Sequence, residues 1–120
     1  MGKIGGQYRT IQVTEIDANT YLTQEQVGII RVRDTQTYVY LPAYLNNSGL
    51  SYLVKALAVG VIVGSVDGGD SIDGAKSWVN TRAYDWIQIT AYGGNSGGWM
   101  IEHMGGVNSP LLISTWHAGA

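Results

Sequence analysis

Residues 84–92, YDWIQITAY, decide the fold class, because apolar and more polar side chains alternate along this stretch. On an extended chain Ile87, Ile89 and Ala91 share one side. The opposite side carries Tyr84, Trp86, Gln88, Thr90 and Tyr92. Such alternation is typical of a β-strand with one buried face. The opposite face is aromatic rather than charged, so it is either a candidate intersubunit or ligand-binding face or an ordinary half-exposed face of a sheet.

Similar runs occur before this stretch, separated by glycine-rich turn sequences. They are rich in Ile, Val, Thr and Tyr, which favour strands, and they cover residues 8–15, 28–34, 37–42 and 60–66. In the first of them Ile11 and Val13 share one face. Short strands with frequent turns predict an all-β protein, a single small sandwich or barrel-like domain of short antiparallel strands.

One segment, residues 50–58, is ambiguous between a short helix and a buried strand. Leu50, Leu53, Val54 and Leu57 recur at the spacing of one helix face. Alternation fits less well, because it places leucines on both faces of an extended chain. The pattern alone therefore leaves both structures open.

Charged residues make up only 13% of the 120 residues, about half of the usual share of roughly 25%, while 45% are hydrophobic. A small monomer has much surface for its volume and normally covers it with charge. We therefore expect copies of the chain or a partner to cover much of this surface. The aromatic residues are 8 Tyr and 4 Trp with no Phe, and both types suit interfaces and sugar-binding surfaces.

The same composition excludes several classes of protein. The formal net charge of −2 makes a nucleic-acid-binding protein unexpected, because such proteins carry a basic stripe. The absence of Cys excludes disulfides, thiolate metal sites and a Cys nucleophile. No apolar run approaches the roughly 20 residues of a membrane-spanning helix, so we expect no membrane partner.

One short motif is similar to a catalytic loop. Gly94-Asn95-Ser96-Gly97-Gly98 resembles the Gly-Asp-Ser-Gly-Gly nucleophile loop of chymotrypsin-like serine proteases, with Asn in place of Asp. In that family the catalytic His and Asp precede the Ser, whereas His103 and His117 both follow it here. A glycine-rich hairpin tip explains the loop without chemistry. We expect no enzyme activity and no catalytic residues.

Three acidic residues, Asp67, Asp70 and Asp73, recur at every third position. Clustered carboxylates can bind Ca²⁺, but an EF-hand loop needs ligands at every second position and a Glu at its end. Asp-Gly and Gly-Gly-Asp sequences are also typical of tight turns. We therefore expect turns rather than a metal site, and no cofactor.

The two ends of the chain carry the candidate anchoring residues. A short N-terminal arm holds Ile4 and Tyr8, and the 1–104 segment forms the β domain. Residues 105–120 form an apolar C-terminal tail after a Gly-Gly break, an anchoring or interface segment containing Leu111, Leu112, Ile113 and Trp116. Exposing these large side chains to water would cost roughly 1.5–3 kcal/mol each, so we expect the tail to dock on a surface.

From Ile29 to Ile101 the chain resembles a small β domain of tailed-phage fibre, head-fibre and capsid-decoration (cement) proteins. The resemblance consists of apolar strands that end in Asp-Thr, Leu-Pro, Gly-Gly-Asp and Ile-Asp-Gly turns, followed by a Gly-rich turn and a Trp. The matching residues are Ile29–Val32, Asp34-Thr35, Tyr38–Leu41, Pro42, Gly49, Leu50–Lys55, Val61–Val66, Gly68-Gly69-Asp70, Ile72-Asp73-Gly74, Asn80, Ile87–Thr90 and Gly97-Gly98-Trp99-Met100-Ile101.

This resemblance implies a homotrimer of β domains at the virion surface, and a strand at residues 50–55. The family usually places the domain after a long shaft. Here only a short arm precedes the first strand, so we expect a compact knob or decoration unit. The resemblance carries no catalytic residues.

Two hypotheses follow for the function. The first is a trimeric capsid decoration (cement) protein or short head fibre that binds and stabilises the shell. It would bind the major capsid or tail protein on the outer surface of the virion. The alternative is a receptor- or carbohydrate-binding knob of a tail fibre. The candidate intersubunit or ligand face consists of Tyr84, Trp86, Tyr92 and Trp99.

Overall fold

The computed structural model describes residues 11–45, 47–92, 98–105 and 111–113, which form two five-stranded sheets. The first sheet has the order β1-β3-β5-β8-β9 and the second the order β10-β7-β6-β4-β2. The strands of the first sheet are β1 (Val13–Ile16), β3 (Gly28–Val32), β5 (Ser51–Ala56), β8 (Trp86–Tyr92) and β9 (Gly98–Gly105). Those of the second sheet are β2 (Thr20–Tyr21), β4 (Tyr38–Leu41), β6 (Ile62–Ser65), β7 (Ser77–Val79) and β10 (Leu111–Ile113). A 3-10 helix, η1, spans Gln24–Gln26.

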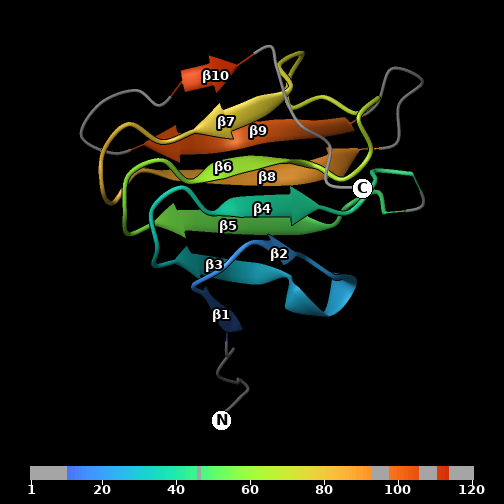
Figure 1. The fold of residues 1–120 in the computed structure, drawn as a ribbon. Coiled ribbons are helices and arrows are strands. Elements are labelled where there is room, and N and C mark those ends of the chain that lie inside the picture. The colour runs from blue at the N-terminus through green and yellow to red at the C-terminus, as the bar shows by residue number, and fades with distance from the viewer. Residues whose placement is uncertain (1–10, 46, 93–97, 106–110, 114–120) are drawn as a thin grey trace, which may run out of the picture.

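The all-β prediction is confirmed, but the expectation of purely antiparallel strands is wrong. The chain alternates between the two sheets from β1 to β6, as the stacked ribbons of Figure 1 show. Successive strands of one sheet therefore run in the same direction. As a result β1, β3 and β5 pair in parallel in the first sheet, and β2, β4 and β6 do so in the second. The other pairs, which all involve the later strands β7 to β10, are antiparallel: β5 with β8, β8 with β9, β6 with β7 and β7 with β10.

The core lies between the two sheets and is built by alternation along each strand. In β8, Ile87, Ile89 and Ala91 are buried while the residues between them are partly exposed, as the sequence predicts. From the second sheet, side chains such as Val39 and Val63 complete the core. Most of the buried surface is apolar, and its removal from water stabilises the sandwich.

Residues 51–56 form a strand, β5, as the phage resemblance implies. Tyr52, Val54 and Ala56 are fully buried and alternate with Leu53 and Lys55, which are partly exposed. The helix-like spacing arises because Leu53 is apolar although it lies on the outer face. The helix alternative for residues 50–58 is therefore wrong.

The backbone approaches most closely where β9 begins. A Cβ at Gly98 would collide with the carbonyl oxygen and the nitrogen of Ser71. The glycine lets the Ser71 carbonyl accept a hydrogen bond from the Trp99 N–H at 2.7 Å, and Asp73 N–H donates to the Trp99 carbonyl at 2.9 Å. The 71–73 turn thus covers the start of this edge strand.

The expected boundary between domain and tail falls at the end of β9, whose last residue is Gly105. Further along, Leu111–Ile113 returns as β10 and pairs antiparallel with β7 at the edge of the second sheet. This part of the expected anchoring tail therefore belongs to the sandwich itself. Trp116 lies outside the described residues, as do Ile4 and Tyr8 at the other end.

The buried phenol of Tyr52 gives the fold a predicted response to alkaline pH. Its hydroxyl donates to the Thr23 carbonyl at 2.7 Å, and burial, with a smaller contribution from Glu25, raises the pKa of Tyr52 to about 12. In the unfolded chain a tyrosine ionises near pH 10. The unfolded state thus loses its proton first, so we expect the free energy of unfolding to fall between pH 10 and pH 12, by up to about 2–3 kcal/mol.

Urea denaturation of the protein and of Tyr52→Phe across this pH range isolates the effect. The variant loses about 1 kcal/mol at pH 7 with the hydrogen bond, but its stability should fall less steeply above pH 10. Parallel curves for the two proteins above pH 10 would contradict the assignment.

Candidate functional site

The candidate site lies on the outer face of the first sheet, where the strand register sets the side chains in rows. One row, Val13, Ile29 and Leu53, is apolar. We call these residues together with Ile11 the apolar patch. The neighbouring row runs across all the strands of the sheet and is called the charged row: Glu15, Arg31, Lys55, Trp86 and Gly105.

The apolar patch is open to solvent at its β1 end. Ile11 is 64% exposed and Val13 50% exposed, while Ile29 and Leu53 are half-buried. A groove of about 370 Å³ runs beside these side chains and is lined by Ile11, Gly28, Ile29, Ser51, Leu53 and Gln88. Single exposed apolar residues are ordinary, whereas neighbouring ones beside a groove make this surface a candidate interaction site.

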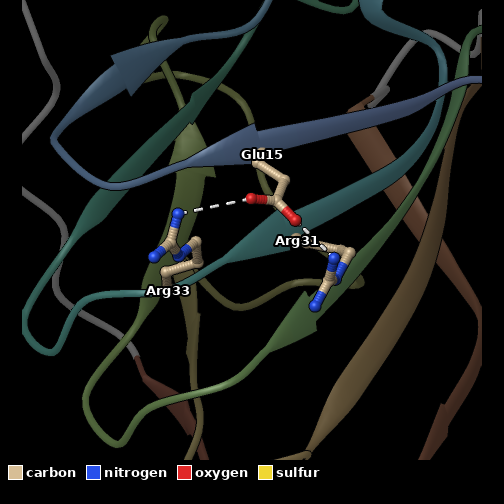
Figure 2. A network of polar contacts seen from close by, with 3 residues as sticks. All are labelled: Glu15, Arg31 and Arg33. Atoms are coloured by element: carbon tan, nitrogen blue, oxygen red, sulfur yellow. Dashed lines mark hydrogen bonds and ion pairs between the residues drawn. The ribbon is translucent and has the colours of Figure 1, made fainter.

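The charged row begins with an ion-pair network. Glu15 on β1 bonds to Arg31 through one carboxylate oxygen and lies 3.4 Å from the Arg33 Nη1 through the other. Figure 2 shows the carboxylate lying between the two guanidinium groups. The three side chains are between 43% and 59% exposed, so this network contributes little to stability. Its effect is to leave excess positive charge at this end of the face.

Trp86 continues the row, and Tyr84 lies in the turn just before β8. Trp86 lies opposite Gly105, and a Cβ on that glycine would stand 2.9 Å from the indole Cζ2 and 3.0 Å from Nε1. The indole therefore occupies the space of the missing side chain and lies across β9. Beside it Lys55 donates to the Tyr84 carbonyl at 2.8 Å, with its Nζ 5.8 Å from the centre of the Tyr84 ring.

The structure divides the residues predicted for the intersubunit or ligand face. Trp86 lies on the outer face of β8, and Tyr92 lies at the far end of the same strand, opposite Gly98. Tyr84 precedes the strand in a turn and is 61% exposed. Trp99 does not belong to the face. It is completely buried, packs against Tyr52 with ring centroids 5.8 Å apart, and donates its indole N–H to the Pro42 carbonyl.

The acidic triplet forms turns, as the sequence predicts. Asp67 accepts from the Gly69 N–H, Asp70 from the Ser65 hydroxyl and Tyr44 N–H, and Asp73 from the Ile101 N–H. Asp67 thus caps its own turn, while Asp70 and Asp73 tie their turns to distant parts of the chain. Among the described residues no group of three or more acidic or His side chains is placed to hold a metal ion. Ser96 and His117 lie outside the described residues, and His103 lies opposite Gln88 on β9.

Sequence reasoning did not find Glu15, Arg31 and Lys55, which come from three different strands. They become neighbours only through the parallel register of β1, β3 and β5. Alternation does place Ile11 and Val13 on one face, but it does not indicate whether that face points toward the core or toward solvent.

Comparison with known proteins gives no relatives: no family model, no curated protein and no solved structure matches the chain. Within the described part of the chain, no helix has the length and apolar character needed to cross a membrane.

Proposed function

We propose that the protein is a structural protein of a tailed-phage virion, a trimeric capsid decoration protein or short head fibre that binds the shell and stabilises it. The proposal rests on the resemblance of residues 29–101 and on one structural observation, the exposed apolar patch. Obligate oligomers bury the more apolar class of interface, and this patch offers such a surface.

The apolar patch suits contact between copies of the chain. Glu15, Arg31 and Arg33 border it on one side and leave its centre, at Ile29 and Leu53, without charge. An apolar centre with a polar rim is the usual anatomy of a protein interface. The low charge content of the whole chain supports the same interpretation.

The mechanism of such a protein is mechanical. Each trimer touches several neighbouring shell subunits, and several weak contacts made together hold it far more tightly than one contact alone. Bridging neighbouring subunits opposes their separation. No catalytic group is required.

Light scattering on the full chain tests the assembly. We expect a mass near three times 12.9 kDa, and a dissociation constant for Leu53→Glu at least about tenfold higher, because the interface would bury an unpaired charge. The matched control is Tyr21→Glu, a residue 52% exposed on the second sheet, which should assemble normally. A monomeric wild-type protein, or equal assembly of Leu53→Glu, would overturn the proposal.

A further inference from the structure

We propose that the charged row and Tyr84 form a binding site for an acidic carbohydrate. Sugar rings stack on Trp86 and Tyr84, and their carboxylate or phosphate groups pair with Lys55 and Arg31. All its residues come from one chain, so the site is complete without the trimer, although Glu15 and Arg31 also border the apolar patch.

The first observation is the position of the Trp86 indole. Gly105 removes the side chain that would otherwise stand 2.9 Å from the ring, so the indole lies across the backbone of β9. Trp86 remains partly exposed in this position. A tryptophan held in this way offers a broad apolar surface with a polar N–H at its edge, which suits a sugar ring with one face of C–H groups and a rim of hydroxyls.

The second observation is the strained backbone of Tyr84. Its φ is 74°, a region that bulky residues rarely adopt, yet the residue is 61% exposed. Hydrogen bonds hold the turn: Tyr84 N–H donates to the Ala56 carbonyl at 2.6 Å, and Lys55 donates to the Tyr84 carbonyl. Strain that is maintained at an exposed aromatic residue is typical of binding sites.

The buried carboxylate of Asp85 fixes the same turn from below. It is fully buried, and its Oδ2 accepts the N–H groups of Thr81 and Arg82 at 3.1 Å each. Tyr84 therefore stands on a rigid support, which lowers the entropy lost when a ligand binds.

The third observation is the charge beside the two rings. Arg31 and Arg33 share the carboxylate of Glu15, and Lys55 is the register neighbour of Arg31, although the chain as a whole carries a net charge of −2. The ammonium of Lys55 has three donors and gives one to the Tyr84 carbonyl, so others can reach a ligand. An anionic sugar matches this excess of positive charge. A nucleic acid matches it poorly, because affinity for its backbone needs many more phosphate contacts.

Calorimetric titration of the full chain with an oligogalacturonate, which carries carboxylates, and with its methyl ester tests the site. We expect the acid to bind at least tenfold more tightly than the neutral ester. A phosphorylated oligosaccharide serves as a second arm. Tighter binding of that probe than of the carboxylate would assign the anion pocket to phosphate, and weaker binding would assign it to carboxylate.

Variants locate the binding. Trp86→Ala and Lys55→Gln should each weaken it at least tenfold, and Gly105→Ala should weaken it by displacing the indole. The matched controls are Tyr21→Ala, an exposed tyrosine of the second sheet, and Lys76→Gln, whose ammonium likewise donates to a backbone carbonyl, that of Gly68. Both controls should bind as the wild type does.

Three outcomes would overturn the site: no binding of either acidic probe at millimolar concentration, equal binding of acid and ester, or unchanged affinity in Lys55→Gln. Because Lys55 is a surface residue, that last variant remains informative if Trp86→Ala fails to fold. A protein that is monomeric by light scattering and still binds the acid would refute the trimer and leave this site standing.

Discussion

Replacing Trp99 by alanine is expected to lower the free energy of unfolding by about 3–5 kcal/mol, a large part of the roughly 5–15 kcal/mol of a typical domain. Trp99 has no exposed surface and packs against Tyr52, which lies on the inner face of the same sheet. Its removal leaves a cavity, and it leaves the Pro42 carbonyl without the indole N–H that lies 3.2 Å away. The turns that hold β9 in place limit how far this cavity can collapse.

Urea denaturation followed by circular dichroism measures this loss. Trp99→Phe is the control, because it keeps most of the buried ring and loses only the N–H donor, so it should cost clearly less than the alanine variant. A loss below about 1.5 kcal/mol for Trp99→Ala, the range of tolerated core exchanges, would contradict the structure at this position.

A second large loss is expected for Asn80→Ala, at least about 3 kcal/mol. Asn80 is only 1% exposed, and its side chain bonds to three backbone groups. Its Oδ1 accepts the Val61 N–H at 2.6 Å, and its Nδ2 donates to the carbonyls of Ala58 and Arg82 at 2.7 and 2.8 Å. Alanine would leave these groups buried without partners, and each unpaired group costs about 1–3 kcal/mol.

The matched control is Asn19→Ala. Asn19 is exposed, and its Oδ1 also accepts one backbone N–H, that of Tyr38, at 2.9 Å. Because water can replace this bond, we expect a loss below about 1 kcal/mol. Equal losses for the two asparagines would show that burial at Asn80 is not what makes its bonds important.

Much of the fold could be predicted from local pattern. The predicted runs at 28–34, 37–42, 60–66 and 84–92 contain β3, β4, β6 and β8. They could be recognised because each shows several strand-forming residues between two turns. The strands β2 and β7 span only Thr20–Tyr21 and Ser77–Val79, which is too short for alternation to be visible. Their pairing partners, rather than their own sequence pattern, make them strands.

The strand directions and the site were less accessible to prediction. Nothing in the sequence of β1, β3 and β5 records that they run parallel, so Glu15, Arg31 and Lys55 could not be recognised as neighbours. Trp86 and Trp99 illustrate the same limit. Both lie on strands and both are large aromatic residues, but their faces are opposite because only Trp99 points between the sheets.

The alternation of β1 to β6 between the sheets has a consequence for how the chain acquires its structure. In this half of the protein strands pair only with others well separated in sequence, such as Val13 with Ile29 and Ile30 with Val54. No local hairpin within this half is available to start folding. A long loop must therefore close before strand pairing can compensate for its loss of entropy. High contact order of this kind predicts slow folding, in the range of milliseconds to seconds. During synthesis the N-terminal half should therefore remain unstructured until most of the polypeptide has left the ribosome.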